Sequence, residues 1–115
     1  MHEYSIVASL VDRVQREVDA RPGAVVHRLH VRIGELAGVE LELLRTAFET
    51  FRERSVCAAA ELELRQVPAT WRCTSCDRAI APGAILRCPD CDRPARLTAG
   101  DEIILERIEM EVRDV

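Results

Sequence analysis

Two pairs of cysteines constrain the fold of this chain more than any other feature. Cys73-Thr-Ser-Cys76 and Cys88-Pro-Asp-Cys91 are separated only by the stretch 77–87. A gap of two residues lets the backbone turn over one metal ion, with amide N–H groups directed at the thiolate sulfurs. Two such turns on adjacent hairpins supply four thiolates at tetrahedral angles, the arrangement that Zn(II) prefers in structural sites. Disulfide bonds, an iron tetrathiolate site and coincidence are the rival interpretations.

The expected zinc site is structural, because four thiolates leave no coordination position for a substrate. The surrounding segment 70–100 has few aliphatic side chains, namely Ile80, Ile85, Leu86, Leu97 and scattered alanines. Segments of this size commonly need a metal or disulfide bonds to fold. We therefore predict that 70–100 is a zinc ribbon that depends on its metal.

Composition narrows the class of protein. The chain has 115 residues and a formal charge of −4, whereas nucleic-acid binding usually requires a basic face. We therefore expect no nucleic-acid partner. No apolar run is long enough to span a membrane and no export signal is present, so we expect no membrane association and a location in the reducing cytoplasm. The sequence contains no nucleophile–base pair and no phosphate-binding glycine loop, so we do not expect an enzyme.

Hydrophobic periodicity predicts a small α/β unit around the ribbon. Apolar residues at steps of three and four predict helices over roughly the first twenty residues and over 39–51. Alternating apolar and polar residues predict strands over 25–33, 61–65 and 108–112.

The order of these elements predicts the topology. The apolar face of the last strand needs a partner, which the ribbon is too small to provide, so this strand should return to the sheet that contains Val31 and Leu62. The expected fold class is α+β, with a small mixed three-stranded sheet, two helices and an inserted zinc-ribbon module. The expected domains are a discontinuous α/β domain, 1–69 with 101–115, and the ribbon insertion, 70–100.

Three further residues are candidates for buried or binding positions. Cys57 lies apart from the cysteine pairs beside two alanines, and we predict a buried free thiol. His27 has the parity of the apolar strand face, which favours a core histidine over a metal ligand. His30 lies on the opposite face between two arginines, where we expect it to be solvated or at a partner surface.

The chain begins Met1-His2-Glu3, a sequence that can chelate a metal. The amine of Met1 and the amide nitrogen of His2 close a five-membered ring, and the same amide with the imidazole Nδ1 closes a six-membered ring. This square-planar nitrogen set favours Ni(II) or Cu(II) over Zn(II). The fourth ligand is open: the Glu3 amide, the Glu3 carboxylate or another donor. Without further context, a histidine at position two most often belongs to a mobile end.

Three motifs together change that interpretation: the N-terminal sequence 1–5, Gly34-Glu35-Leu36-Ala37-Gly38-Val39 and the two cysteine pairs. In this order and at this length, the chain resembles the HypA/HybF family of nickel metallochaperones for [NiFe]-hydrogenase maturation, and the resemblance covers nearly the whole chain. It implies that 1–69 with 101–115 is a nickel-binding domain. It assigns Ni(II), as transferred cargo, to Met1, His2 and Glu3, and structural Zn(II) to Cys73, Cys76, Cys88 and Cys91.

The resemblance also implies partners. These are a nickel-handling GTPase of the HypB type, the hydrogenase large-subunit precursor and, in some members, urease maturation proteins. The alternative interpretation is a zinc-ribbon interaction or regulatory module in which the N-terminal motif has no role with nickel.

Overall fold

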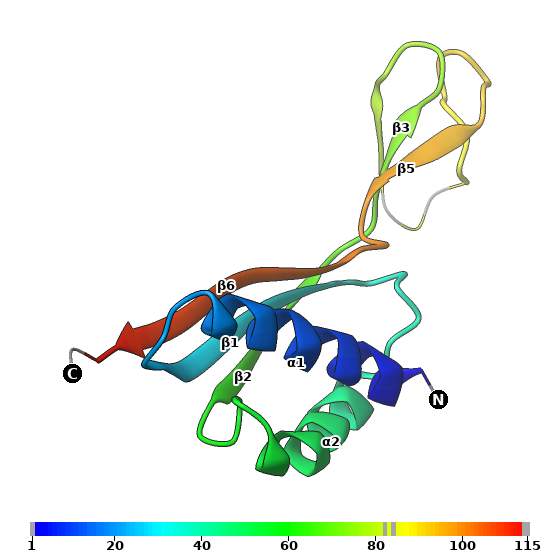
Figure 1. The fold of residues 1–115 in the computed structure, drawn as a ribbon. Helices are drawn as coiled ribbons and strands as arrows, with labels where there is room; N and C mark the ends of the chain where they lie inside the picture. Colours follow the sequence, from blue (N-terminus) through cyan, green and yellow to red (C-terminus); the bar gives the residue numbers. More distant parts are fainter. Residues whose placement is uncertain (1, 82, 84, 114–115) are drawn as a thin grey trace. The chain divides into compact units, whose positions relative to one another are not determined.

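The computed structural model describes residues 2–81, 83 and 85–113. In chain order its elements are α1 (Glu3–Asp19), β1 (Ala24–Gly34), α2 (Leu41–Phe51), a 3₁₀ turn η1 (Arg52–Arg54), β2 (Glu61–Val67), β3 (Thr70–Cys73), β4 (Ala79–Ile80), β5 (Ala95–Ala99) and β6 (Ile103–Val112) (Figure 1). Among the described residues, no helix is both long enough and apolar enough to cross a membrane.

The chain forms two compact units. The first, here called the helical unit, comprises Met1–Arg32, Val39–Arg65 and Ile104–Val115. The second, the ribbon unit, comprises Ile33–Gly38 and Gln66–Ile103. The separate ribbon domain 70–100 stays a prediction, and the compact unit around it also takes in Ile33–Gly38.

The helical unit is held together by the apolar stripes of α1 and α2. In α1, Val7, Leu10, Val11 and Val14 are buried, at the spacing of one helix face. In α2, Leu44, Ala47 and Phe48 are buried. Burial of each large apolar side chain contributes about 1.5–3 kcal/mol, so packing of these stripes against each other stabilises both helices.

The three-stranded sheet has the order β2-β1-β6, and its strands run in mixed directions. The Gly34 N–H donates to Glu102 at 2.8 Å and the Arg113 N–H donates to Gly23 at 3.2 Å. Residue numbers therefore increase along β1 in the direction in which they decrease along β6, so the two strands are antiparallel. On the other side, Arg28 contacts Glu61 at 3.0 Å, while the Glu35 N–H donates to Val67 at 2.8 Å, so β1 and β2 are parallel. The predicted fold class and the return of the last strand to this sheet are confirmed.

The predicted position of His27 is wrong. Val26 and Leu29 are both buried. Two residues lie between them, whereas in a regular strand one exposed residue lies between successive buried residues. His27 is consequently exposed and lies 3.3 Å from Glu111. This shift in parity is typical of a β-bulge. The sequence does not reveal it, because residues 25 and 26 are both valine and either could face the core. By contrast, the predicted burial of the Cys57 thiol is confirmed, and this burial raises its pKa.

In the ribbon unit, β3 is the central strand of a second sheet of order β4-β3-β5. Both neighbours are antiparallel to it. Its small core consists of Cys73, Ile80 and Cys88, with Trp71, Cys91 and Ala95 packed around them. Two of the three buried side chains of this cluster are therefore cysteines, so the folding of this unit is tied to the state of its sulfurs.

Candidate metal centre

Each cysteine pair forms a turn of the same construction. The Asp77 N–H donates to the Cys73 carbonyl at 3.1 Å, and the Asp92 N–H donates to the Cys88 carbonyl at 2.9 Å. Both aspartates have left-handed backbone angles, with φ of 63° and 54°, a conformation that aspartate tolerates better than most residues. The reversal after the second cysteine of each pair directs both of its sulfurs to the same side.

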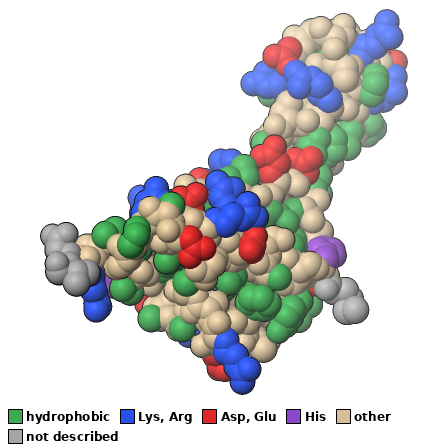
Figure 2. Space-filling model, in the orientation of Figure 1, with side chains coloured by type: hydrophobic (Ala, Val, Ile, Leu, Met, Phe, Trp, Pro, Cys, Tyr) green, Lys and Arg blue, Asp and Glu red, His purple; other side chains and the backbone are tan. Residues whose placement is uncertain are grey.

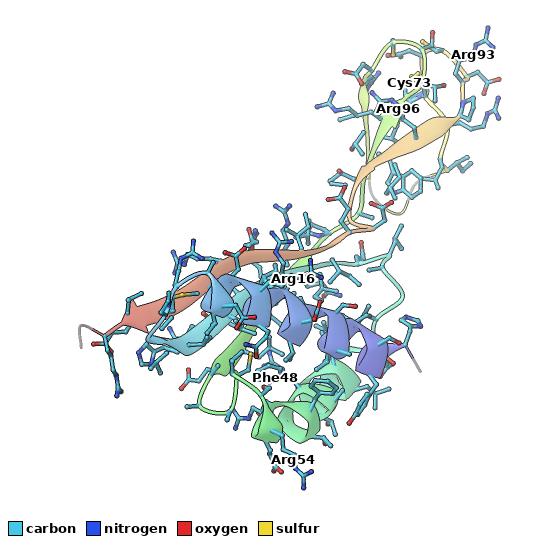
Figure 3. The ribbon with its side chains drawn as sticks, viewed as in Figure 1. Arg16, Phe48, Arg54, Cys73, Arg93 and Arg96 are labelled. Carbon is cyan, nitrogen blue, oxygen red and sulfur yellow. The ribbon has the colours of Figure 1, made fainter. Side chains whose placement is uncertain are left out.

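The four sulfurs meet in one cluster. The Sγ atoms of Cys73, Cys76, Cys88 and Cys91 all lie within 4.8 Å of one another, and Cys73 lies at the end of β3 (Figure 3). The Sγ atoms of Cys76 and Cys88 are 3.7 Å apart. A tetrahedron with Zn–S bonds of about 2.3 Å has sulfur–sulfur edges of about 3.8 Å. All four cysteines are free thiols, so this donor set fits a four-coordinate thiolate site.

Backbone amides and neighbouring thiols set the ionisation of the cluster. The amides of Cys76 and Ser75 lie 3.4 and 3.3 Å from the Cys73 sulfur and lower the pKa of that thiol to about 7. Hydrogen bonding with Cys76 and burial raise the pKa of Cys91 to about 12. Cys91 is therefore a thiolate at neutral pH only beside a cation, whose binding releases its proton.

The N-terminal candidates lie in the helical unit. Met1 lies outside the described residues. His2 is the N-cap residue of α1 and is exposed, and its carbonyl accepts from the Ile6 N–H at 3.0 Å. Glu3 is buried, with 6% of its surface exposed, and its Oε2 accepts from the Glu40 N–H at 3.2 Å. The Glu3 carboxylate therefore links the first turn of α1 to the start of α2.

The remaining candidate residues, Cys57, His27 and His30, do not belong to the four-cysteine cluster or to the N-terminal motif. Among the described residues, the four cysteines are the only set of three or more His, Cys, Asp or Glu side chains close enough to share a metal ion. His30 contacts Glu109 through Nε2 and lies 3.3 Å from Glu63 through Nδ1. Its ring thus bridges two carboxylates with different nitrogens, which is a hydrogen-bonding role.

Two contacts that hold the N-terminal motif and the 34–39 motif in position were not predicted from the sequence. Glu35 accepts a hydrogen bond from the Ala69 N–H at 2.8 Å, and the Glu40 amide serves as the partner of Glu3. The glycines at 34 and 38 mark a turn around Glu35, but nothing in the sequence names its partner 34 residues away.

Comparisons with known proteins agree on one family. Residues 1–110 match the family model described as "Hydrogenase/urease nickel incorporation, metallochaperone, hypA". The chain is 38% identical to the hydrogenase maturation factor HypA of Wolinella succinogenes, over 99% of this chain and 98% of the relative. It is 34% identical to the protein of the same name from Shewanella baltica, over 96% and 97%.

Solved structures give the same result. The solution structure of the Ni metallochaperone HypA from Helicobacter pylori is similar with a TM-score of 0.72 and 33% identity, over 98% of this chain and 100% of that one. A second solution structure of a HypA protein has a TM-score of 0.80 and 32% identity, over 98% of both chains.

Proposed function

Because the chain belongs to the HypA family of metallochaperones for nickel incorporation, we propose that it binds Ni(II) through Met1, His2 and Glu3 and delivers it during [NiFe]-hydrogenase maturation. It acts by binding and handover, without a catalytic step. The observation that carries the proposal is the anchoring of Glu3. This residue is buried and bonded to α2, so a packed helix turn holds the adjacent backbone nitrogens in place beside the exposed His2 side chain.

The proposed nickel ligands are nitrogens of the N-terminus: the Met1 amine, the His2 amide and the His2 imidazole Nδ1. Deprotonated amides and imidazole in a square plane suit Ni(II). The fourth ligand is the Glu3 amide, the Glu3 carboxylate or a donor from another part of the fold. Because Oε2 of Glu3 already accepts the Glu40 N–H, ligation through that oxygen would weaken the start of α2, whereas ligation through the amide would not.

We propose that Cys73, Cys76, Cys88 and Cys91 hold a structural Zn(II). The cluster offers four soft sulfurs, and four thiolate ligands fill the coordination sphere of a tetrahedral zinc ion. Nickel held by nitrogens and zinc held by sulfurs differ in ligand softness, which keeps the two metals from exchanging. A chaperone must also release its cargo, and a nitrogen site of roughly micromolar affinity, about −8 kcal/mol, allows release.

The proposed partners follow from the family. They are a nickel-handling GTPase of the HypB type, the hydrogenase large-subunit precursor and, as a further client, urease maturation proteins. We place the handover in the cytoplasm, where reducing conditions keep the thiols available for metal.

The proposal is tested by titrating Ni(II) into the protein that starts at Met1 and into its His2→Ala variant. Removal of the imidazole breaks the six-membered ring and makes the amide harder to deprotonate, so affinity should fall at least tenfold, or about 1.4 kcal/mol. His27→Ala is the matched control, because His27 is also an exposed histidine of the helical unit.

Zinc content, measured on the same samples, should stay at one per chain in both variants. In the reverse experiment, Cys88→Ala should lose zinc and keep its nickel affinity, because the two donor sets share no residue. Equal nickel affinity in native protein and His2→Ala would refute the nickel site and leave a zinc-ribbon interaction module as the better interpretation.

A further inference from the structure

Tyr4, Leu43 and Phe51 form an apolar surface on the helical unit, here called the helix patch. Tyr4 and Leu43 are 50% and 49% exposed, whereas large apolar side chains of a small domain are usually buried. Tyr4 packs edge-on against Phe51, with ring centroids 5.6 Å apart and ring planes at 71°. Figure 2 shows hydrophobic side chains gathered over α1 and α2 beside a histidine near the N-terminus.

Two members of the helix patch lie on the same side of α2 because of helix geometry. Leu43, Ala47 and Phe51 follow at intervals of four on α2, so they lie in one row along the helix. The middle residue of this row, Ala47, is buried together with Leu44 and Phe48. Leu43, at the start of the row, is half-exposed, so the apolar face of α2 extends beyond the part that is buried.

Two exposed carboxylates lie at the start of α2, within three residues of Leu43. Glu40 and Glu42 are exposed at the start of α2, and neither side chain takes part in an ion pair with any residue that the structure describes. On α1, by comparison, Asp12 pairs with Arg16 at 2.6 Å. An apolar surface with unpaired negative charges at its rim is complementary to an apolar surface with a basic rim.

The helix patch adjoins the proposed nickel ligands. Tyr4 directly follows Glu3 in α1, and Glu3 is bonded to the Glu40 amide, three residues before Leu43. Handover of a metal by ligand exchange requires donors of both proteins on the same ion, with bonds of about 2 Å. Any protein that takes nickel from His2 must therefore cover the surface next to Tyr4 and Glu40.

From these contacts we propose that the helix patch, with Glu40 and Glu42 at its rim, is the docking surface for the protein that receives the nickel. The recipient presents an apolar contact surrounded by lysine or arginine side chains, next to its own nickel ligands. This inference rests on the proposed nickel function, but it concerns protein docking and is tested separately from metal affinity.

The test compares Leu43→Glu with Ile85→Glu. Both replace an exposed apolar side chain by glutamate, but Ile85, 81% exposed, lies in the ribbon unit. Three quantities are measured: nickel affinity, the rate of nickel transfer to the small chelator EDTA, and binding of the nickel-free protein to the nickel-free hydrogenase large subunit. Circular dichroism checks that each variant is folded.

Leu43→Glu should weaken binding of the large subunit at least tenfold while nickel affinity and transfer to EDTA stay unchanged, because EDTA does not need the helix patch. Ile85→Glu should match the native protein in all three measurements. Docking is measured without nickel. If the native protein bound no nickel, the proposed function would be refuted, but the docking measurement would still test whether the helix patch binds the large subunit.

Charge is tested with Glu42→Gln, which leaves the apolar contacts in place. It should weaken docking by a smaller factor than Leu43→Glu. Added salt should also weaken the docking of this variant less than it weakens that of the native protein. Unchanged docking in Leu43→Glu, or an equal loss in Ile85→Glu, would overturn the proposal. A third outcome would also overturn it: light scattering shows that the native protein is a dimer, Leu43→Glu is a monomer, and Leu43→Glu still binds the large subunit. The helix patch would then be the contact between two copies of this chain.

Discussion

At the scale of single residues, the two aspartates that follow the cysteine pairs have the most demanding backbone. Asp77 and Asp92 take positive φ and donate the N–H group that closes each turn. Asp92 also accepts from Arg87 at 3.0 Å through its side chain, but that pair is exposed and contributes no more than about 1 kcal/mol. The backbone conformation is therefore the larger reason for a residue of this kind at position 92.

A pair of variants separates backbone from side chain at this position. Asp92→Ala and Asp92→Gly both lose the side-chain contact with Arg87 and keep the bond from Arg87 to the backbone carbonyl at position 92. Only alanine has the steric cost of the left-handed conformation, about 1–2 kcal/mol. Asp92→Gly should therefore hold zinc longer than Asp92→Ala when a chelator is added, with zinc release followed by a colorimetric indicator. If the two variants released zinc at the same rate, the conformation at this residue would not limit ribbon stability.

At the scale of elements, the mixed sheet carries a charged network on β1 and its neighbours. His30 of β1 contacts Glu109 of β6 and Glu63 of β2, and Arg28 lies 3.0 Å from Glu61. One imidazole thus contacts carboxylates from both neighbouring strands. His30 was expected to be solvated or at a partner surface, but 22% of its side chain is exposed and both ring nitrogens have acidic partners within the unit.

This network makes a prediction about acid stability. The hydrogen bond with His30, followed by the charge of Arg107, lowers the pKa of Glu109. The unfolded chain, with a glutamate pKa near 4.3, then binds the proton more tightly than the folded chain. The resulting stability is present above the unfolded value and is lost as pH falls through the lower folded value. Glu109→Gln should therefore lose stability at pH 7 and little at pH 3.

Urea denaturation midpoints at pH 7 and pH 3 measure this difference. Glu53→Gln is the control, because Glu53 is exposed and forms no ion pair with the described residues. A Glu109→Gln effect of the same size at both pH values would contradict the role of the ionised carboxylate.

At the scale of the whole molecule, the two glycines of the ribbon unit at 34 and 100 bring separate chain segments into contact. The Leu36 N–H donates to the Gly100 carbonyl at 2.7 Å. A Cβ atom at Gly34 would lie 2.2 Å from the Gly100 backbone, a distance that only a backbone shift could relieve. The absence of a side chain at position 34 therefore allows the segment Ile33–Gly38 to join the ribbon unit.

Gly34→Ala should destabilise the ribbon unit by about 3 kcal/mol or more, because overpacking against backbone cannot relax by a rotamer change. Gly38→Ala is the matched control: its φ of 74° is unfavourable for alanine, but nothing lies within 4 Å of the added Cβ, so its cost should stay at about 1–2 kcal/mol. Thermal unfolding followed through Trp71 fluorescence reports on this unit. A smaller loss in Gly34→Ala than in Gly38→Ala would show that the close approach is not required.

The sequence by itself determined the features that depend on neighbours a few residues apart. The spacing of Cys73 and Cys76, and of Cys88 and Cys91, was sufficient to predict the sulfur cluster, because a turn of that length directs both thiols inward. Periodicity was sufficient to predict α1, α2 and the three strands of the mixed sheet, since burial of one face repeats every 3.6 or 2 residues. The roles of Met1, His2 and Glu3 in nickel binding stay a prediction.

Only the tertiary structure decided which distant groups meet. Glu3 and the Glu40 amide are 37 residues apart in sequence, Glu35 and Ala69 are 34 apart, and His30 and Glu109 are 79 apart. Nothing in local pattern or composition selects these pairs, because each depends on how helices and strands pack once their apolar faces are buried. A shift in the burial parity of β1 left His27 exposed, and the packing of α1 against α2 left Tyr4 exposed beside Phe51. The sequence therefore identified the four sulfurs of the cluster, and packing determined which groups surround the N-terminal motif.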